Sequence, residues 1–348
     1  MNQPSLSVEK KQGVYILPQI NGVGGPASFR VRLVNGLKER GIREVGSIDD
    51  PDCGAVLVIG GTKEIATLLK ARRKGLRIVQ RLNGMNWIHR KLRVPPGYFI
   101  KCEINNQLLK FIRKNIADRI IYQSQFARQW WQTVCGSTNA SSTVVYNGID
   151  LTDFSPEGEG KPPEDHYRLL MVEAHIGGGY ERGLDTAVKM TYLLNQQLDK
   201  PVRLTVAGNV QEHLKTYWSR QSGGTVDWAG VVPGSNIPTL DRSAHLLFSA
   251  DLNAACPNSV IEALACGLPV LAFATGSLPE IISGDSGLVV PYGSNYWNLE
   301  NPDIAGLAKG AVEILTHQEK YRAPARARAE EAFGLSRMVE QYISALFD

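Results

Sequence analysis

The chain has 348 residues, 43% of them hydrophobic, and a formal net charge of +4. At roughly 100 to 200 residues per domain, this length predicts two domains with large cores. No stretch approaches the roughly 18 to 20 continuous apolar residues of a membrane-spanning helix, and the polar N-terminus lacks the apolar core of a signal peptide. Five cysteines without a CxxC pair and six histidines without HExxH spacing favour reduced thiols over disulfides or a zinc site. We therefore expect a cytoplasmic protein.

The net charge hides an asymmetry between the two halves of the chain. Residues 1–150 hold 23 Lys and Arg against 10 Asp and Glu, whereas residues 151–348 hold 15 against 24. A basic first half predicts an anionic partner, which is a phospholipid surface, a lipid-phosphate acceptor or a nucleic acid. Segments 71–77, 89–93 and 108–119 mix cations with apolar residues, which favours peripheral contact with an anionic membrane. A solvated helix face is the alternative for any one of them.

Strands and helices are expected to alternate along the chain in two series. The first series starts with a strand at Gly13, a Gly-rich turn and an amphipathic helix that ends at Gly41. A Pro- and Gly-rich surface connection, 155–166, separates it from the second. Further strands are predicted at 55–61, 77–84, 119–124 and 142–146, then at 167–174, 203–208, 225–232, 245–250, 268–273 and 286–293. This rhythm predicts two doubly wound parallel sheets with a ligand cleft between them. The last segment, 336–348, is expected to be a helix that crosses back to the first domain.

Two Gly-rich loops lie between a strand and a helix. The first, NGVGGPASF (21–29), has neither the GxGxxG spacing nor a GK[ST] sequence, but glycine lets backbone approach a ligand and a helix N-terminus favours anions. The second, GGGYERGLD (177–185), adds Arg182, whose guanidinium can pair two oxygens of a diphosphate. An ordinary tight turn is the alternative for both loops.

The stretch PNSVIEALACGLPVLAFATGSLPEI (257–281) places two carboxylates where core packing would not. Glu262 lies in a short Ala- and Leu-rich helix, and Glu280 follows a Gly-Ser-Leu-Pro turn one strand later. The helix N-terminus explains only that a Glu is tolerated there. A carboxylate can also accept two hydrogen bonds from the vicinal hydroxyls of a ribose, while the N–H groups of Ser259 and Val260 meet a phosphate.

From Pro257 to Gly293 the chain resembles the donor-site signature of retaining glycosyltransferases with the GT-B fold, in the large family-4 group (glycosyltransferase group 1). Other motifs stand in the order this family has, namely GGPASF, VVYNGIDLTDF (144–154), ERGLDTA, LTVAGN, VDWAGVV and VVPYG. The resemblance implies an α/β fold of two Rossmann-like domains with an interdomain cleft. It assigns residues 1–154 to acceptor binding and residues 155–335 to nucleotide-sugar binding.

The resemblance also implies an activity and a site. A sugar would pass from a nucleoside-diphosphate sugar of the UDP or GDP type to a hydroxyl of a glycan or lipid-linked acceptor, with retained configuration and without a metal or other cofactor, in surface polysaccharide or glycolipid synthesis. The segment TGSLPE, which ends at Glu280, resembles the family's loop at the donor end of the strand that follows Glu262. The residues implied for catalysis are Arg182, Asn83 and Gly25, and those implied for donor binding are Glu262, Asn258, Ser259, Val260, Gly24 and Val231.

The chain departs from the family pattern at three places. Ala254 replaces the first of two glutamates that the motif separates by seven residues, and Glu173, Ala174 and His175 stand where the family often has an Arg. Asn83 stands where relatives often place His or Asp, and its amide cannot act as a base at neutral pH. Two alternatives therefore stay open: a catalytically silent relative that binds sugar nucleotide or glycan as a scaffold, and a sugar-nucleotide epimerase. A nucleic-acid binder would rest on the basic half alone.

Overall fold

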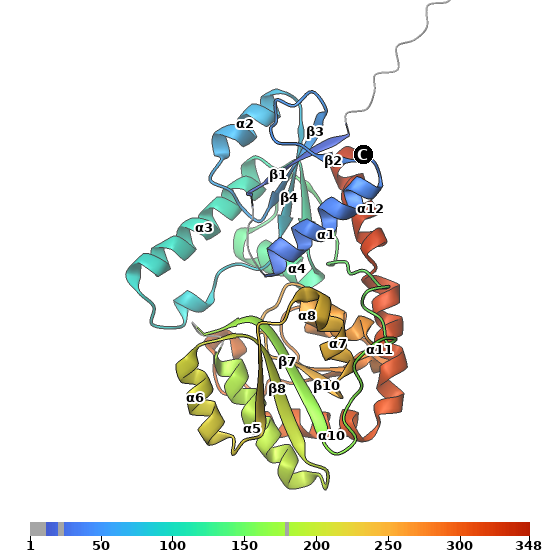
Figure 1. Cartoon of the computed structure of the whole chain (residues 1–348). Helices are drawn as coiled ribbons and strands as arrows, with labels where there is room; N and C mark the ends of the chain where they lie inside the picture. The colour runs from blue at the N-terminus through green and yellow to red at the C-terminus, as the bar shows by residue number, and fades with distance from the viewer. Residues whose placement is uncertain (1–11, 20–23, 178–180) are drawn as a thin grey trace, which may run out of the picture.

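The computed structural model describes residues 12–19, 24–177 and 181–348. They form two α/β domains, one above the other in Figure 1, each built on a six-stranded parallel sheet with helices on both faces. The predicted fold class is therefore confirmed. The inner strands of both sheets are rich in Val, Ile and Leu and are largely buried on both faces, as parallel sheets covered by helices require.

The N-domain sheet has the strand order β2-β1-β3-β4-β5-β6. Its strands are β1 (Gly13–Leu17), β2 (Arg43–Glu44), β3 (Cys53–Ile59), β4 (Arg77–Leu82), β5 (Arg119–Tyr122) and β6 (Ser141–Val144). The connecting helices are α1 (Gly25–Glu39), α2 (Ile65–Arg73), the short 3-10 turn η1 (Ile88–Arg90), α3 (Pro96–Asn115) and α4 (Gln125–Cys135).

The C-domain sheet has the strand order β12-β11-β10-β7-β8-β9. Its strands are β7 (Tyr167–Ile176), β8 (Val202–Val210), β9 (Val226–Gly230), β10 (Leu246–Ser249), β11 (Val270–Phe273) and β12 (Gly287–Val290). Its helices are α5 (Glu181–Gln197), α6 (Glu212–Gln221), α7 (Ile237–Arg242), α8 (Asn258–Ala265), α9 (Leu278–Ile281), α10 (Ile304–Thr316) and α11 (Gln318–Ala332), with 3-10 turns η2 (Gly234–Asn236), η3 (Gly284–Ser286) and η4 (Tyr296–Asn298).

The end of the chain returns to the N-domain. Helix α12 (Leu335–Phe347) follows α11 and lies beside α1 in Figure 1. Its residues Met338, Val339 and Tyr342 belong to the same core cluster as Phe29 and Leu33 of α1. The C-terminal helix therefore buries its apolar face in the N-domain core.

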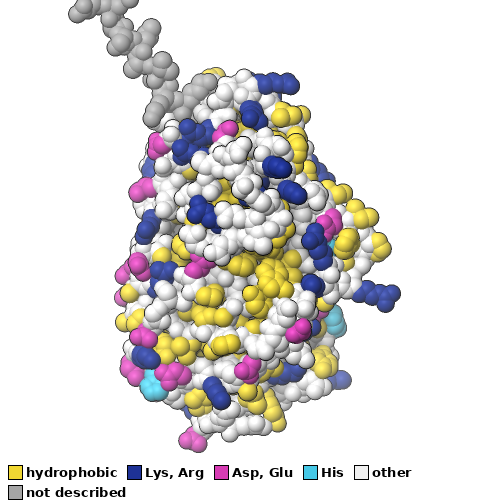
Figure 2. All heavy atoms as spheres, turned by 180° about the vertical axis from the view of Figure 1, so that it is seen from behind, with side chains coloured by type: hydrophobic (Ala, Val, Ile, Leu, Met, Phe, Trp, Pro, Cys, Tyr) yellow, Lys and Arg dark blue, Asp and Glu magenta, His cyan; other side chains and the backbone are white. Residues whose placement is uncertain are grey.

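Aromatic side chains join the domains along one edge of their interface. Trp297 of η4 packs against Trp87 and Trp130 of the N-domain, with ring centroids 5.2 and 5.1 Å apart. Phe126 at the start of α4 stacks on the same Trp297 ring at 6.5 Å. The space-filling view from behind shows hydrophobic side chains at the level where the domains meet and on the projecting edge that α3 forms (Figure 2). These contacts hold the two sheets with their carboxyl ends facing a shared space.

Candidate active site

A cleft with a volume of about 1160 Å³ lies between the two domains. The N-domain contributes the start of α1, the end of β4 and the turn η1, and the C-domain contributes the ends of β7 and β8, the loop after β10 and the start of α8. Ligands of open α/β sheets bind at the carboxyl ends of the strands, and this cleft is formed by two such edges.

The structure brings most of the predicted site residues to the cleft. The lining residues among them are Gly24, Gly25, Asn83, Val231, Asn258, Ser259 and Glu262. Two others lie elsewhere. The side chain of Val260 is fully buried in the C-domain core, so only its backbone is near the start of α8. Arg182 lies in the first turn of α5 and donates to the side chain of Asn301 at 3.4 Å, away from the cleft lining. The Gly-rich segment 177–185, which contains Arg182, falls partly outside the described residues.

Two helix N-termini open at the cleft without a side-chain cap. Helix α1 begins after Gly24, whose φ of 120° suits glycine, and a Cβ at Gly24 or Gly25 would meet nothing within 4 Å. Helix α8 begins after Pro257, which also supplies no capping side chain. The first N–H groups of an α-helix have no partner within the helix, and the helix dipole favours an anion there. The two ends can therefore hold phosphate oxygens from opposite walls.

Glu262 is bound from the other side of the cleft. Its Oε1 accepts a hydrogen bond of 2.6 Å from Nη2 of Arg32, which lies on α1 about two turns after Gly25. The two side chains are 12% and 19% exposed, and the Arg32 guanidinium stacks 5.7 Å from the ring of Phe154 in the interdomain connection. The second carboxylate oxygen, Oε2, has no hydrogen-bond partner among the described residues, so it is open to a ligand.

Glu280 has a different environment. Its carboxylate accepts from the backbone N–H groups of Gln125 and Phe126 and from the hydroxyl of Tyr146, each at 2.9 Å. It therefore caps the start of N-domain helix α4, and it does not line the cleft. Burial, together with the bond to Glu280, raises the pKa of Tyr146. The loop of Glu280 follows β11, as the sequence indicates, but its carboxylate makes an interdomain contact.

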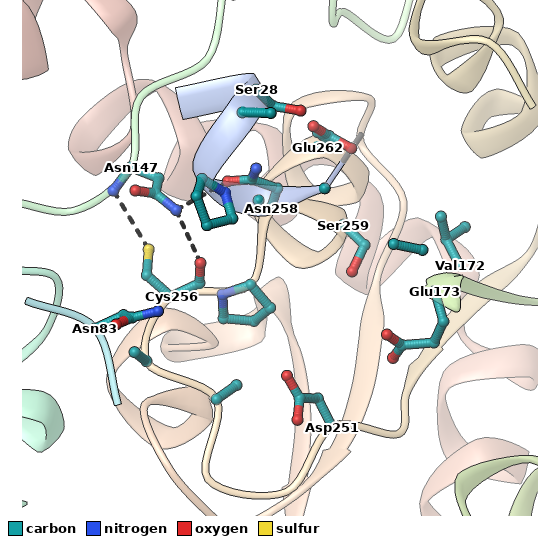
Figure 3. A pocket seen from close by; sticks show the side chains of 18 of the residues that line it. Ser28, Asn83, Asn147, Val172, Glu173, Asp251, Cys256, Asn258, Ser259 and Glu262 are labelled. Atoms are coloured by element: carbon teal, nitrogen blue, oxygen red, sulfur yellow. Dashed lines mark hydrogen bonds between the residues drawn. The ribbon is translucent and has the colours of Figure 1, made fainter. Parts of the chain in front are cut away.

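A buried polar network joins the domains beneath the cleft. The side-chain amide nitrogen of Asn147 donates to the Cys256 carbonyl and to Oδ1 of Asn258, both at 2.9 Å (Figure 3 draws the contacts to Cys256). Oδ1 of Asn147 accepts from Arg81 at 2.9 Å. Arg81 is 2% exposed and stacks on the Phe29 ring at 3.7 Å, and burial lowers its pKa. The oxygen of Asn258 is thus committed to the interface, which leaves its amide nitrogen for a ligand.

The cleft lining also contains two carboxylates and a histidine that the motifs do not include. Figure 3 shows the carboxylates of Glu173, at the end of β7, and Asp251, just after β10, on the same wall of the pocket. Burial raises the pKa of both, and the charge of Asp251 adds to the effect on Glu173. On the N-domain side, His89 is 4% exposed and its Nε2 lies 2.7 Å from Oε1 of Glu103. Hydrogen bonds from Arg90, and then from His89, lower the pKa of Glu103 to about 2.

Sequence reasoning missed some of these residues. Asp251 had a signal, because it lies two residues after a buried strand whose carboxyl end faces the cleft. Glu173 shows up in the sequence only as a departure from the family pattern. His89 and Arg32 gave no signal, because their positions depend on packing between elements far apart in the chain. Among the described residues, no group of three or more His, Cys, Asp or Glu could hold a metal ion, and no helix is long and apolar enough to cross a membrane.

The fold and the cleft define a two-domain protein of the GT-B class. A sucrose-phosphate synthase from Thermosynechococcus elongatus has the same fold with a TM-score of 0.75 and 15% identity, over 96% of this chain and 98% of that one. Anabaena HepE, in complex with UDP and glucose, matches with a TM-score of 0.68 and 14% identity, over 96% and 99% of the two chains.

Within this class, residues 169–317, which lie in the C-domain, match the family described as glycosyl transferases group 1. The GDP-mannose-dependent alpha-(1-6)-phosphatidylinositol dimannoside mannosyltransferase of Mycobacterium tuberculosis is 26% identical over 243 residues, which are 66% of this chain and 57% of the relative. The chain thus matches little more than half the length of that relative.

Proposed function

We propose that the protein is a retaining glycosyltransferase that moves a sugar from a nucleoside-diphosphate sugar to an acceptor hydroxyl. The observation that carries this is the convergence of two uncapped helix N-termini and the half-free carboxylate of Glu262 in one interdomain cleft. The helix ends suit a diphosphate, and Oε2 of Glu262 suits a ribose hydroxyl. The nucleotide would lie against α8 in the C-domain, and the acceptor would bind the N-domain wall.

The chemical step needs stabilisation of the departing diphosphate more than a side-chain base. We assign this to the N–H groups at Gly24 and Gly25, and to Arg182, whose side chain would have to turn from Asn301 toward the cleft. The bond of Arg182 to Asn301 is long at 3.4 Å, so a diphosphate would displace it readily. Asn83 lines the N-domain wall of the cleft, and we propose that its amide bonds a sugar hydroxyl. Arg182→Ala is expected to lower kcat by about 10²- to 10³-fold while leaving the unfolding temperature unchanged.

The carboxylates Glu173 and Asp251 fit the donor sugar better than a bare diphosphate. Burial raises the pKa of Glu173 to about 8, so at neutral pH its protonated acid can donate a hydrogen bond to a sugar hydroxyl and adds no negative charge beside the phosphates. The pKa of Asp251 is raised only to about 6, so at neutral pH its carboxylate can accept a hydrogen bond from a second hydroxyl. They stand on the wall where Ala254 replaces a family glutamate, and Ala254 itself is held by a 2.9 Å bond from the Ser277 N–H to its carbonyl. We propose that no metal takes part, so that EDTA leaves donor binding unchanged.

The experiment is to incubate the protein with UDP- and GDP-sugars, with and without glycan or lipid-linked acceptors, and to follow the anomeric signal of the product by NMR. The mannosyltransferase relative is named as GDP-mannose-dependent, and HepE was solved with UDP, so both nucleotides belong in the panel. Transfer with retained configuration supports the proposal. Sugar-nucleotide binding without transfer or hydrolysis would make the protein a scaffold, and interconversion of the sugar without an acceptor would make it an epimerase.

We also propose that the N-domain contacts an anionic membrane on the cytoplasmic side, in surface polysaccharide or glycolipid synthesis. Helix α3 carries a stripe of apolar side chains, 40–56% exposed, which we name the α3 patch: Tyr98, Phe99, Ile100, Ile104 and Phe111. All of them except Tyr98, which lines the interdomain cleft, border an open groove of about 430 Å³ in the half of the chain with the basic excess. Burial of these apolar side chains in the bilayer would favour membrane binding. Each Lys or Arg near the surface of an anionic membrane adds about 1 kcal/mol to the binding free energy.

Co-sedimentation with vesicles tests this contact. We expect the protein to prefer anionic over neutral vesicles and to lose most of the binding when Ile100→Asp and Ile104→Asp are combined. Tyr192→Asp, on α5 of the C-domain and 64% exposed in the native chain, is the matched control. Equal binding to both kinds of vesicle would rule the contact out.

A further inference from the structure

We propose that Arg32 is a positioning residue of the donor site, which holds the Glu262 carboxylate from across the cleft so that it accepts the hydroxyls of a nucleotide ribose. This inference rests on the proposed function, because it takes Glu262 as the ribose-binding group. It follows that Arg32, a residue of the N-domain, contributes to the affinity with which the C-domain binds a nucleotide.

The hydrogen bond from Arg32 occupies only one of the two carboxylate oxygens of Glu262. Nη2 of Arg32 donates to Oε1 of Glu262 at 2.6 Å, and Oε2 has no partner among the described residues. A carboxylate accepts up to about four hydrogen bonds, so a ribose can bind while the guanidinium stays in place. The ligand and Arg32 therefore act on the carboxylate together and do not compete for it.

The setting of Arg32 makes the bond more than a surface ion pair. Both side chains are less than one-fifth exposed, and the guanidinium rests near the Phe154 ring. Pairs between fully exposed side chains contribute little, because water screens them and both chains must be ordered. Here packing has already ordered Arg32, so the carboxylate is presented in one orientation before a nucleotide arrives.

A buried acid on the C-domain side supports the same conclusion. Asp241 of α7 is 1% exposed, and neither of its carboxyl oxygens has a described partner. Burial, followed by the charge of Glu262, raises its pKa. Because the folded state favours neutral Asp241, this acid offers Glu262 no charge partner on the C-domain side. Among the described residues, the ion pair that Glu262 makes is the one with Arg32.

The bridge also changes how a Glu262 variant must be read. Substituting Glu262 removes the ribose contact and the interdomain bond at once, and it leaves Arg32 with an unpaired charge. A loss of nucleotide binding in that variant alone would not separate the two effects. Variants of Arg32 keep the carboxylate and remove only its support.

The experiment is calorimetric titration of UDP and GDP, and of their 2′,3′-dideoxy analogues, into the wild type, Arg32→Gln and Arg32→Lys. We expect Arg32→Gln to lower the affinity for UDP or GDP about three- to tenfold, because the Glu262 side chain must then be ordered when the nucleotide binds. The affinity of Arg32→Lys should lie between those of Arg32→Gln and the wild type. The dideoxy analogues should bind the wild type and both variants equally, because they offer no hydroxyls to the carboxylate. Arg30→Gln is the matched control, since Arg30 lies on the same helix and pairs with Glu44 inside the N-domain.

A double-mutant cycle completes the test. In a Glu262→Gln background, Arg32→Gln should cause no further loss of affinity, because the residue acts through the carboxylate. Unchanged or tighter UDP and GDP binding by Arg32→Gln would overturn the inference, and so would an equal loss for the dideoxy analogues, which would make Arg32 a phosphate ligand. If the wild type binds neither nucleotide, the proposed function itself fails. If Arg32→Gln does not fold, Arg32→Lys carries the same comparison.

Discussion

Glu262 and Glu280 come from one stretch of sequence, and the structure gives them different tasks. Both are C-domain carboxylates that accept hydrogen bonds from the N-domain. Glu280 receives three donors, from the start of α4 and from Tyr146, and lies outside the cleft. Glu262 receives one, from Arg32, and lines the cleft with an oxygen to spare. The number of donors that each carboxylate already holds, more than its place in a motif, indicates which one is free to bind a ligand.

The largest expected effect is on stability and comes from Glu280→Ala. This change removes the acceptor of the Gln125 and Phe126 N–H groups at the start of α4, where the Ser124 cap remains, and the partner of the Tyr146 hydroxyl. We expect a loss of about 3 kcal/mol in the free energy of unfolding, about 1 kcal/mol for each lost hydrogen bond. Urea denaturation measures it. Nucleotide affinity of the remaining folded protein should stay within about twofold, since Glu280 touches no part of the cleft lining. A large loss of affinity with little loss of stability would place Glu280 in the donor site.

Glu262→Gln should show the opposite pattern. The amide keeps the size of the side chain but loses the charge, so we expect UDP or GDP to bind about thirtyfold more weakly, about 2 kcal/mol. The free energy of unfolding without nucleotide should fall by less than in Glu280→Ala, because only one interdomain bond is weakened. Affinity equal to that of the wild type would remove Glu262 from the ribose site.

The smallest expected effect is a pH dependence set by Asp241 beside Glu262. Burial raises the pKa of Asp241 well above its ordinary value of 3.8, so the folded state favours the neutral acid. Stability is therefore lost as pH rises through the folded pKa. Asp241→Asn should be more stable than the wild type at pH 8 by at least about 1.4 kcal/mol, the equivalent of one pKa unit, with a smaller gain at pH 5. The exposed Asp199→Asn is the control, and equal gains at both pH values would contradict the assignment.

The sequence predicts the fold well because hydrophobic runs and turns are local signals. The strand at Gly13, the connection 155–166 and the final helix all appear close to their predicted ranges. The same local signals bring Gly24, Gly25 and Glu262 to the cleft, since the two glycines lie at a strand-to-helix turn and Glu262 lies in the helix that follows another such turn.

The contacts between domains could not be predicted in this way. The bond from Arg32 to Glu262 joins residues 230 positions apart, and the bonds of Glu280 reach residues 134 to 155 positions away. No periodicity reports such pairs, because they depend on how the two finished domains meet. For Arg182 too, the sequence does not predict the contact: its motif suggests that it binds a phosphate, whereas its described partner is Asn301.

The most direct test of the donor site is a thermal-shift comparison of the wild type, Glu262→Gln and Glu280→Gln with UDP, GDP and their sugars. At a ligand concentration of about 100 Kd, binding adds about 2.7 kcal/mol of stability, which is easily visible. We expect at least one of these nucleotides to raise the unfolding temperature of the wild type and of Glu280→Gln, and to do so far less for Glu262→Gln. If no nucleotide shifts the wild type, or if Glu262→Gln shifts as much as the wild type, the cleft does not hold a nucleotide through Glu262.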